Sequence, residues 1–257
     1  MISPLASVSP KAKIGNNVTI MPFATVFEDV EIGDNTYIHP NALIYPDTII
    51  GNNCKIFPGA VIGIINQDLK YNGEKSNTVI GNNTTIREYV TIHKGTADRM
   101  TTKVGNNCLI MAYSHLGHDC LIGNNVILAN NATFAGHITV EDFTVVEGVV
   151  AAQQFVTIGR HSFIAGASLV RKSVPPYIRV AREPLQFIGV NTIGLIRRGF
   201  DKETIKQIED IYRIIFVRGY NLSNALDAVE NEIPESAVRT EILNFIRTQK
   251  DGIIKGI

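Results

Sequence analysis

The sequence contains no tryptophan and only three cysteines among its 257 residues. Three cysteines cannot make the disulfide framework that stabilises small secreted proteins. No apolar run is long enough to cross a membrane, so no membrane span is expected. The chain does not begin with a charged segment followed by an apolar stretch, which would indicate a signal peptide. These absences together favour a cytoplasmic protein.

An excess of charge of either sign is also missing. Lysine and arginine number 24, aspartate and glutamate number 24, and the formal net charge is +0. A balanced chain has no general attraction for polyphosphate, so no nucleic-acid partner is expected. The length is sufficient to bury a full hydrophobic core.

The sequence is rich in a short repeat led by Ile-Gly or a close variant. Most steps between successive leading residues are 18 residues, and the two exceptions, 30 and 24, are also multiples of six. Self-similarity at a fixed short period indicates a solenoid. The leading residues are Ile14, Ile32, Ile50, Ile80, Val104, Ile122, Val140 and Ile158.

Counting from each leading residue gives every position an offset within its coil. Large aliphatic or aromatic side chains recur at offsets 0, 6 and 12, as in Ile122, Leu128 and Phe134, and small ones recur at offsets 4, 10 and 16. Three sides of six residues, joined at Asn- and Gly-rich corners, predict a triangular coil. The cysteines occupy small inward slots, so we interpret them as core packing rather than as reactive thiols; they are Cys54, Cys108 and Cys120.

This pattern resembles the hexapeptide-repeat, left-handed parallel β-helix, and the handedness is taken from that resemblance. We expect an all-β left-handed parallel β-helix over residues 1–177, interrupted by loops at about 64–77 and 94–103. Both loops leave the coil near offset 14, so they emerge from one edge, which is a candidate binding side.

The period of six stops after Pro175 and Pro176, and helical signals begin. We expect a linker at 178–190 and a C-terminal α-helical domain at 191–257. Asp201 is suited to cap a helix with apolar residues at helical spacing, and Gly219 is suited to end it. A second helix is expected over Ser223–Glu230, and Pro234 is expected to open a third.

The six histidines fall into two groups by offset. His39 occupies a slot held elsewhere by Met21 and Phe57, which indicates packing, and His161 occupies a corner slot held elsewhere by asparagine, which predicts an exposed structural residue. The other four lie at offsets 13, 11, 14 and 15, on the outward face from which the loops emerge; they are His93, His115, His118 and His137. Solvated surface histidines are the simplest alternative, but core packing does not explain this group.

The period of 18 then places Gly136 and Gln154 in one column with His118, and His137 and Phe155 in the next column with Asp119. Because Gly136 has no side chain, a substrate has room beside the His118 ring and access to a backbone N–H. A general base with a nearby amide donor is suited to acyl transfer, in which the acceptor hydroxyl attacks a thioester directly. A zinc site on stacked histidines is an alternative, but Gly136 and Gln154 occupy the positions stacked on His118, so we expect neither a metal nor another cofactor.

Three motifs make the likeness more specific. They are Ile65–Lys70 in the first loop, Ser114–Cys120 followed by Asn130–His137, and Gly189–Phe200 at the start of the helical domain. In this order and spacing they resemble the family of acyl-carrier-protein–UDP-N-acetylglucosamine O-acyltransferases of lipid A synthesis, across essentially the whole chain.

The resemblance implies transfer of a (R)-3-hydroxyacyl group from acyl carrier protein to the 3-hydroxyl of UDP-N-acetylglucosamine, by a homotrimer with active sites between subunits. By position, His118 is the general base, Asp119 orients it, and the N–H of Gly136 stabilises the oxyanion. The remaining substrate contacts implied in this way are Gln67, Asp68, Lys70, His115, His137, Gln154, Asn191, Arg197 and Arg198.

The sequence departs from the family pattern as well. Gln153 stands where the family often has His, and Ile193 where it often has Glu, so two polar contacts differ. Gly166 falls at the position that limits acyl-chain length, and a residue without a side chain favours a longer chain. Pro184 stands in place of a frequent His near the end of the acyl groove. A late basic cluster is expected to dock the acidic carrier protein; it comprises Arg160, Arg171, Lys172, Arg179 and Arg182.

Two competing functions remain at this point. An N-acyltransferase acting on an amino sugar nucleotide usually carries a uridine-binding domain before the solenoid, whereas here the repeat begins by residue 14. A non-catalytic scaffold on the same fold would not need His118 beneath Gly136 with Asp119 alongside.

Overall fold

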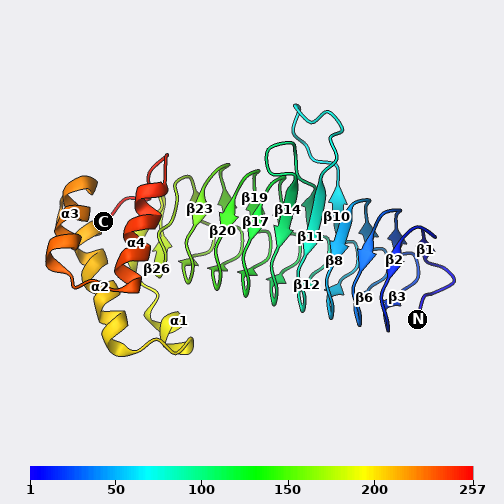
Figure 1. Ribbon diagram of the computed structural model, residues 1–257, viewed down its shortest axis with the longest axis horizontal. Coiled ribbons are helices and arrows are strands. Elements are labelled where there is room, and N and C mark those ends of the chain that lie inside the picture. The colour runs from blue at the N-terminus through cyan, green and yellow to red at the C-terminus, as the bar shows by residue number, and fades with distance from the viewer. Residues whose placement is uncertain (257) are drawn as a thin grey trace.

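The computed structural model describes residues 1–256 as a long left-handed parallel β-helix that ends in a cluster of four helices. The coils stack along one axis, and the helices lie at the C-terminal end of the prism (Figure 1). The fold class predicted from the repeat is therefore confirmed. No helix within residues 1–256 is long and apolar enough to cross a membrane.

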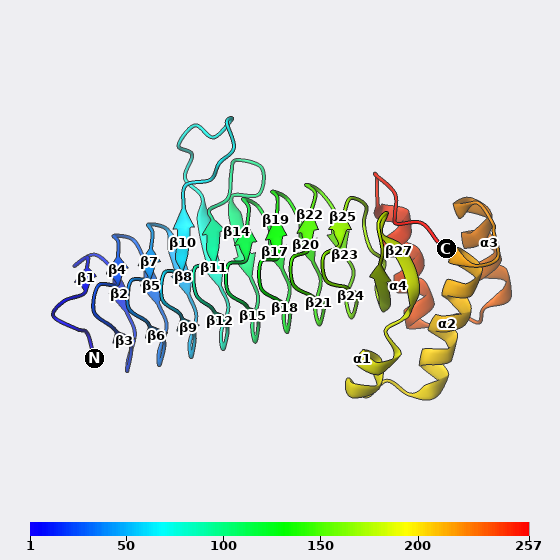
Figure 2. The same cartoon turned by 180° about the vertical axis from the view of Figure 1, so that it is seen from behind.

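Three sheets of short strands form the sides of the prism, and the view from behind shows the same stacking (Figure 2). The first sheet comprises β1 (Ser7–Val8), β4 (Thr25–Val26), β7 (Leu43–Ile44), β10 (Val61–Ile64), β13 (Thr91–His93), β16 (His115–Leu116), β19 (Thr133–Phe134), β22 (Ala151–Ala152) and β25 (Leu169–Val170). The second comprises β2 (Lys13–Ile14), β5 (Glu31–Ile32), β8 (Thr48–Ile50), β11 (Asn77–Ile80), β14 (Thr101–Val104), β17 (Leu121–Ile122), β20 (Thr139–Val140) and β23 (Thr157–Ile158).

The third sheet has ten strands and reaches the helical end. It comprises β3 (Thr19–Ile20), β6 (Tyr37–Ile38), β9 (Lys55–Ile56), β12 (Thr85–Ile86), β15 (Leu109–Ile110), β18 (Ile127–Leu128), β21 (Val145–Val146), β24 (Phe163–Ile164), β26 (Ile178–Ala181) and β27 (Gln186–Val190). Neighbouring strands are parallel throughout, except that β26 and β27 are antiparallel.

The interior follows the predicted offsets. Ile122, Leu128 and Phe134, at offsets 0, 6 and 12 of one coil, are each no more than 2% exposed. The three cysteines are also buried, and they are free thiols as expected. Burial raises the pKa of the Cys120 thiol to about 12, so this group is protonated at neutral pH.

A ladder of side-chain acceptors explains the glycine at offset 1. The side-chain oxygen of Asn52 accepts the N–H of Asp34 in the preceding coil at 2.7 Å. In the same way, the side-chain oxygen of Asn82 accepts the N–H of Asn52 at 2.7 Å. A Cβ on Gly33 would lie 2.4 Å from the Asn52 side-chain oxygen, so only glycine leaves room for this bond. The last acceptor of the ladder is Asp142, which accepts the Asn124 N–H at 2.7 Å. Glu141 stands in the glycine slot of that coil, and its carboxylate accepts the Arg160 N–H of the following coil at 3.0 Å.

The corners turn through left-handed backbone. Residues at offsets 3, 9 and 15 have positive φ, including Asn17, Asn53 and Asp119 at 55°, 55° and 60°. Asparagine and aspartate tolerate this conformation better than most residues, which accounts for their frequency at the corners.

The segment expected to be a linker, residues 178–190, instead forms β26 and β27. Its buried residues Ile178 and Val180 continue the apolar pattern of the third sheet, and Val180 pairs with Ile164 of β24. The chain then reverses, so that β27 returns antiparallel along β26. The β-helix is thus closed by a hairpin that belongs to its own sheet.

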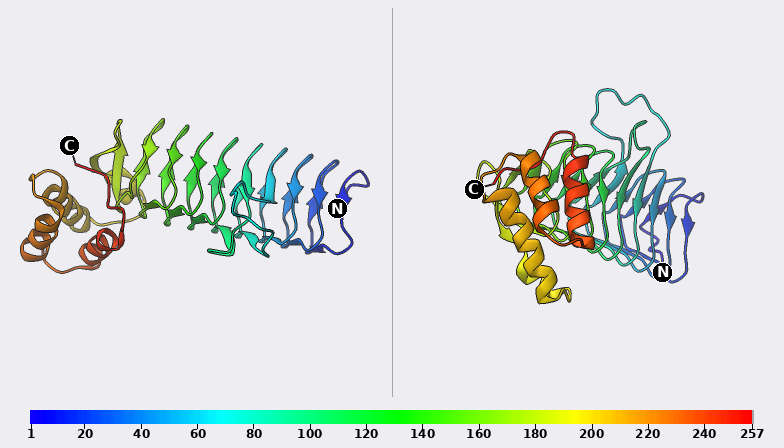
Figure 3. Two further views of the ribbon diagram at one scale, coloured as in Figure 1. Left: turned by 90° about the horizontal axis from the view of Figure 1, so that it is seen from above. Right: turned by 60° about the vertical axis from the view of Figure 1, so that its left-hand side comes forward.

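Four helices follow, and they cluster at the end of the prism in both views of Figure 3. They are α1 (Thr192–Arg197), α2 (Lys202–Phe216), α3 (Leu222–Glu232) and α4 (Ala237–Thr248). Asp201 caps α2 as predicted, by accepting the Thr204 N–H at 2.7 Å. The third expected helix begins at Ala237 rather than at Pro234, because the Ser236 hydroxyl accepts the Arg239 N–H and caps it there.

The prediction that His161 is exposed was wrong. The residue is only 4% exposed, because the helical region covers its corner. Its ring lies between Phe143 and Tyr177 at centroid distances of 4.9 and 5.6 Å, and Phe200 meets it edge-on. Burial, followed by the positive charges of Arg160 and Arg198, lowers the pKa of the His161 imidazole to about 4.

Replacement of His161 by phenylalanine should make folding less sensitive to acid. The unfolded chain binds a proton at this residue near its ordinary pKa, about 6.5, whereas the folded chain does so only near 4. Stability from this group is therefore complete above about pH 6.5 and falls as the pH drops. Between about pH 7.5 and about pH 5, the wild type should lose on the order of 2 kcal/mol more unfolding free energy than His161→Phe.

Urea unfolding at the two pH values measures this difference. His39→Phe is the matched control, since His39 stacks on Phe57 at 4.4 Å but is less buried than His161. An equal pH dependence in the wild type and His161→Phe would show that the buried ring does not resist protonation.

Candidate active site

The two loops project from one edge of the prism, as predicted, and lie next to each other (Figures 1 and 2). The first joins β10 to β11 and the second joins β13 to β14. Beside them is a pocket of about 600 Å³. It is lined by Gln67, Asp68, Leu69, Lys70, His93, His115, Gly117, His118, Ala135, Gly136, His137, Gln154 and Phe155.

Most of the candidate residues from the sequence meet in this pocket. Gln67, Asp68 and Lys70 come from the first loop, and the others come from successive coils stacked at the same corner. From their offsets, the four histidines were expected on an open outward face, but they line a pocket beside the loops instead. His93, His118 and His137 are only 6%, 9% and 9% exposed.

His118 and Asp119 form a hydrogen-bonded pair. The Nδ1 atom of His118 lies 2.9 Å from Oδ2 of Asp119, whose side chain is fully buried. Asp119 stands at a corner with φ of 60°, which turns its carboxylate back toward the preceding ring. In the neutral tautomer whose Nδ1–H donates to this carboxylate, Nε2 is the ring nitrogen with a free lone pair.

The second loop surrounds the Asp119 carboxylate with donors. The Thr96 hydroxyl donates to Oδ2 at 2.6 Å, and the Thr96 N–H donates to Oδ1 at 3.0 Å. The N–H of Arg99 adds a longer bond to Oδ1 at 3.3 Å. Burial raises the pKa of the Asp119 carboxyl, but the bonds from Thr96 and His118 outweigh it and hold the pKa below its usual value.

Gly136 lies directly against the His118 ring, as the period of 18 predicts. A Cβ at Gly136 would lie 2.5 Å from both Cε1 and Nε2 of that ring. Within residues 1–256 no acceptor bonds the Gly136 N–H, whereas the neighbouring His137 N–H donates to the His118 carbonyl at 2.9 Å. The site therefore offers a free amide donor next to the basic ring nitrogen.

His137 stands between two carboxylates. Its Nδ1 lies 3.1 Å from Asp98 of the second loop, and its Nε2 lies 3.9 Å from Asp119. Its ring stacks on Phe155 at 4.5 Å and meets the His118 ring edge-on at 4.8 Å. Burial lowers the pKa of His137, while the two carboxylates oppose this effect.

His115 and His93 line the same pocket. The Nδ1 atom of His115 lies 2.7 Å from the Thr91 hydroxyl, and the two imidazoles meet edge-on at 4.8 Å. Burial, together with the neighbouring His115 and His118, lowers the pKa of His93 to about 4. His93 is therefore neutral at physiological pH and suited to hydrogen bonding rather than to charge pairing.

The remaining candidates lie away from the pocket within this chain. Asn191 caps α1, and its side-chain N–H donates to the His161 carbonyl at 2.8 Å. Arg197 and Arg198 lie at the end of α1, and Arg198 stacks over Phe143 at 4.5 Å. Gly166 occupies another corner, where its N–H donates to Glu147 at 2.8 Å.

The basic cluster expected to bind a carrier protein is partly engaged within the chain. Arg160 lies 3.3 Å from Glu241, and Arg171 pairs with Glu183. Lys172 donates to the Asp251 carbonyl at 2.7 Å. Arg179 stacks over Phe163 at 5.7 Å. Some of its charge is therefore balanced before any partner binds.

The sequence did not single out the residues of the second loop. Thr96 donates to Asp119, and Asp98 lies 3.1 Å from Nδ1 of His137. Glu74 of the first loop accepts the Ala97 N–H at 3.0 Å. The only signal was that both insertions leave the same edge. Which loop residues reach the coils depends on how each loop folds back, and the period does not describe that.

His118, Asp119 and His137 are also close enough to share a metal ion, since one ligand atom of each lies within 4.8 Å of the others. Both oxygens of Asp119 already accept hydrogen bonds from the second loop or from His118. A metal at this site would have to compete with those bonds, so the arrangement fits an orienting carboxylate better than a metal ligand.

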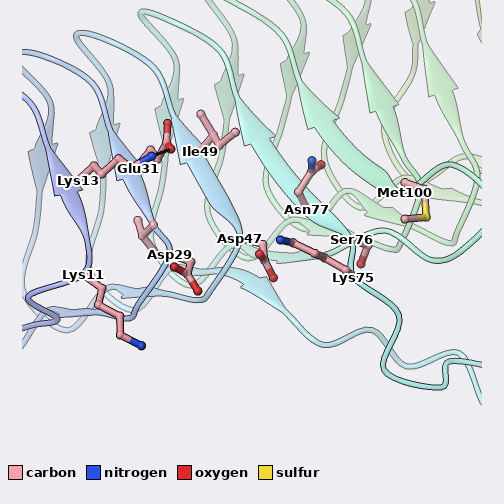
Figure 4. Close-up of a pocket in the computed structure, with 11 residues that line it drawn as sticks. Lys11, Lys13, Asp29, Glu31, Asp47, Ile49, Lys75, Ser76, Asn77 and Met100 are labelled. Carbon is pink, nitrogen blue, oxygen red and sulfur yellow. Dashed lines mark hydrogen bonds and ion pairs between the residues drawn. The ribbon is translucent and has the colours of Figure 1, made fainter.

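A second hollow, of about 520 Å³, lies on the second sheet near the N-terminal coils (Figure 4). Its charges are largely balanced by neighbours: Lys13 pairs with Glu31 at 2.6 Å, and Asp47 pairs with Lys94 at 3.1 Å. None of the candidate residues lines it. The pocket that the four histidines line is therefore the candidate active site.

Comparison with known families gives two matches. The family described as "Udp N-acetylglucosamine O-acyltransferase; Domain 2" matches residues 174–254. The family described as "Bacterial transferase hexapeptide (six repeats)" matches residues 29–64 and 101–136.

Individual relatives agree with these matches. The chain is 40% identical to the acyl-[acyl-carrier-protein]–UDP-N-acetylglucosamine O-acyltransferase of Aliivibrio salmonicida, over 76% of this chain and 75% of that protein. The crystal structure of a UDP-N-acetylglucosamine acyltransferase from Bacteroides fragilis is 48% identical, covers 99% of this chain and 100% of its own, and superposes with a TM-score of 0.98. The corresponding enzyme of Francisella novicida is 39% identical over 99% and 94%, with a TM-score of 0.96.

Gly136→Ala should displace the His118 ring without unfolding the protein. The added methyl would overlap a side chain, which can rotate, rather than fixed backbone. We expect the ring-proton NMR signals of His118 to shift strongly while the thermal midpoint changes little. Gly148→Ala is the control, because the nearest atom to its Cβ is 3.3 Å away. Unchanged His118 signals in Gly136→Ala would contradict the close approach.

Proposed function

The chain belongs to the family of UDP-N-acetylglucosamine O-acyltransferases, and we propose on that basis that it transfers a (R)-3-hydroxyacyl group from acyl carrier protein to the 3-hydroxyl of UDP-N-acetylglucosamine. The relatives named above act on this nucleotide sugar, and the Aliivibrio protein is named for acyl carrier protein as well. The reaction is the first step of lipid A synthesis.

One arrangement supports this proposal above all. His118 is fixed through Nδ1 by the buried Asp119, and its Nε2 lies beside a glycine whose amide is free. A base next to an amide donor is what direct attack of a hydroxyl on a thioester requires. The three cysteines are buried and free, so no thiol is placed to act as a nucleophile.

These positions support the following mechanism. His118 Nε2 takes the proton of the sugar 3-hydroxyl as its oxygen attacks the thioester carbon. The carbonyl oxygen becomes an oxyanion, which the Gly136 N–H stabilises. When the carbon–sulfur bond breaks, the protonated His118 returns its proton to the departing thiolate of the carrier. Asp119 stabilises the transient imidazolium and holds the ring in place.

The first loop is suited to hold the acceptor sugar. Asp68 lies 4.0 Å from Nε2 of His118, and Gln67 and Lys70 line the same pocket. We assign Asp68 and Gln67 to sugar hydroxyls and Lys70 to phosphate. His115, His137 and Gln154 complete the walls around the sugar and the acyl carbonyl.

A homotrimer would bring into the site candidate residues that lie outside the pocket of their own chain. Asn191 and Arg198 lie at the corner of Phe143 and His161, and Arg197 is the last residue of α1; none of the three lines the pocket around His118. They can contact the nucleotide only if they belong to a neighbouring copy that closes the cleft. A ridge of bulky side chains supports such packing: Phe23, Tyr89, Tyr113 and Val149 are 61%, 56%, 58% and 62% exposed, and all have positive φ.

Such a ridge is unfavourable on a monomer. Aromatic and β-branched residues are disfavoured in left-handed backbone, and the same corner holds Asn41 and Asn131 in other coils. Exposed apolar side chains at strained positions fit an interface with other copies. Gly166 lies at the adjacent offset, so an acyl chain directed toward it would lie between copies, and the absence of a side chain favours a longer chain.

The test is one assay. The protein is incubated with UDP-N-acetylglucosamine and 3-hydroxyacyl carrier proteins of several chain lengths, and products are analysed by mass spectrometry. We expect an O-acylated product, with the longer chains preferred, and no effect of added chelator. The 3-deoxy sugar nucleotide is the control, because it lacks the attacking hydroxyl. No product at any chain length would refute the proposal, and strong inhibition by chelator would favour a metal-dependent mechanism.

His118→Ala should lower kcat by at least ~10²-fold, because general-base catalysis contributes that much or more. The fold should be intact, since the ring packs at the edge of the coils and not within their core. His39→Ala is the matched control, as its ring stacks on Phe57 far from the pocket. Near-normal turnover by a folded His118→Ala variant would exclude this residue as the base.

A further inference from the structure

Thr96 is the residue of the second loop that most directly contacts the catalytic pair. It is buried, with 7% of its surface exposed. Its hydroxyl lies 2.6 Å from Oδ2 of Asp119, the same oxygen that lies 2.9 Å from Nδ1 of His118. One carboxylate oxygen thus accepts from the proposed base and from a threonine hydroxyl at the same time.

The backbone of Thr96 makes a separate contact. Its N–H donates to Oδ1 of Asp119 at 3.0 Å. The backbone bond anchors the loop to the carboxylate, whereas the hydroxyl acts on the oxygen that faces His118. These two roles can be separated experimentally, because a side-chain substitution leaves the backbone bond in place. The hydroxyl also accepts a longer bond from the Asp98 N–H at 3.3 Å, which valine removes and serine keeps.

The surroundings of Thr96 hold it in this position. Gly95, the preceding residue, receives hydrogen bonds at its carbonyl from Asn66 at 3.3 Å and from Ser76 at 2.5 Å. Ala97, the following residue, donates to Glu74 at 3.0 Å. All three partners belong to the first loop, so the loop that lines the sugar pocket also fixes the threonine.

We propose that Thr96 is a positioning residue for catalysis, whose hydroxyl sets the orientation and the effective charge of Asp119 toward His118. A donor on Oδ2 draws electron density from the oxygen that stabilises the imidazolium. It also prevents rotation of the carboxylate away from the ring. This inference rests on the proposed acyl transfer, since it assigns a role within that reaction.

Other charged groups face the same pair and must be considered. Arg99 donates to the Asp119 carbonyl at 2.8 Å, and His137 lies 3.9 Å from Oδ2. Asp68 lies 4.0 Å from the His118 ring, and Glu74 stands on the adjoining loop. None of these groups changes in the substitutions below, so a difference in pH dependence reports on the hydroxyl.

The experiment compares Thr96→Val with Thr96→Ser. Valine keeps the shape and the backbone N–H but removes the donor, and serine keeps the donor. We expect Thr96→Val to lower kcat by roughly 10-fold to 10²-fold, because a misplaced catalytic group costs about this much, with little change in KM. The acidic limb of the pH profile of kcat/KM should move to higher pH, since Oδ2 then carries more negative charge. Thr96→Ser should retain most of the activity and the wild-type profile.

A measurement without substrate accompanies the kinetics. The Nδ1–H proton of His118, bonded to Asp119, should shift in the NMR spectrum of Thr96→Val and keep its position in Thr96→Ser. Thr84→Val is the control: it removes a buried hydroxyl that donates to the Gly105 carbonyl at 2.8 Å, remote from the pocket, and should change stability without changing the pH profile. Thr96→Ala replaces Thr96→Val if the valine variant does not fold.

The outcomes separate the two proposals. An active wild type, together with an unchanged pH profile and His118 signal in Thr96→Val, would overturn the positioning role and leave the acyl transfer intact. Equal losses in the valine and serine variants would overturn it as well, because they would indicate only a structural role. A wild type without acyl transfer would refute the proposed reaction, and the NMR comparison would still decide whether Thr96 controls the pair.

Discussion

The hydrogen bond between one coil and the next is the constraint on which the structure depends. Each coil donates N–H groups to carbonyls of the following coil, as Leu121 does to Ile138 and His115 does to Ala132. Parallel strands pair well only in fixed register. Because of this register, residues 18 apart lie above one another, so a residue's offset determines whether its side chain points into the coil or stands at a corner, and which residue of the next coil it faces.

The candidate active site depends directly on this register. His118 and Gly136 belong to adjacent coils, and their contact needs no loop and no long-range packing. The loops add what the coils lack, namely donors on both oxygens of Asp119 and polar side chains above the pocket. A regular scaffold therefore positions the groups proposed to react, and two insertions lie beside them. Precise positioning on regular elements is how a site avoids reorganisation during reaction.

The period explains why the sequence predicts some features and not others. It predicts the core, the single edge that carries both loops, and the Gly136–His118 contact, because each depends only on offset. It does not predict that His161 is buried, because the residues that cover its ring come from the helical region, whose packing the repeat does not describe.

Two other features lie outside the period. Residues 178–190 lack the hexapeptide count, yet the alternation of apolar residues at Ile178 and Val180 suffices for strand pairing. The sequence does not predict the contact of Thr96 with Asp119, because the position of Thr96 depends on contacts between two irregular loops.

The strict register also has an evolutionary consequence. A whole coil gained or lost before β10 would change the length of the prism and leave every contact of the pocket in place. A single residue gained or lost between His118 and Gln154 would shift the following residues by one position along the coil and separate groups that are now in contact. The scaffold can thus vary freely in length at its N-terminal end, while the coils around the site can change in side chain but not in number of residues.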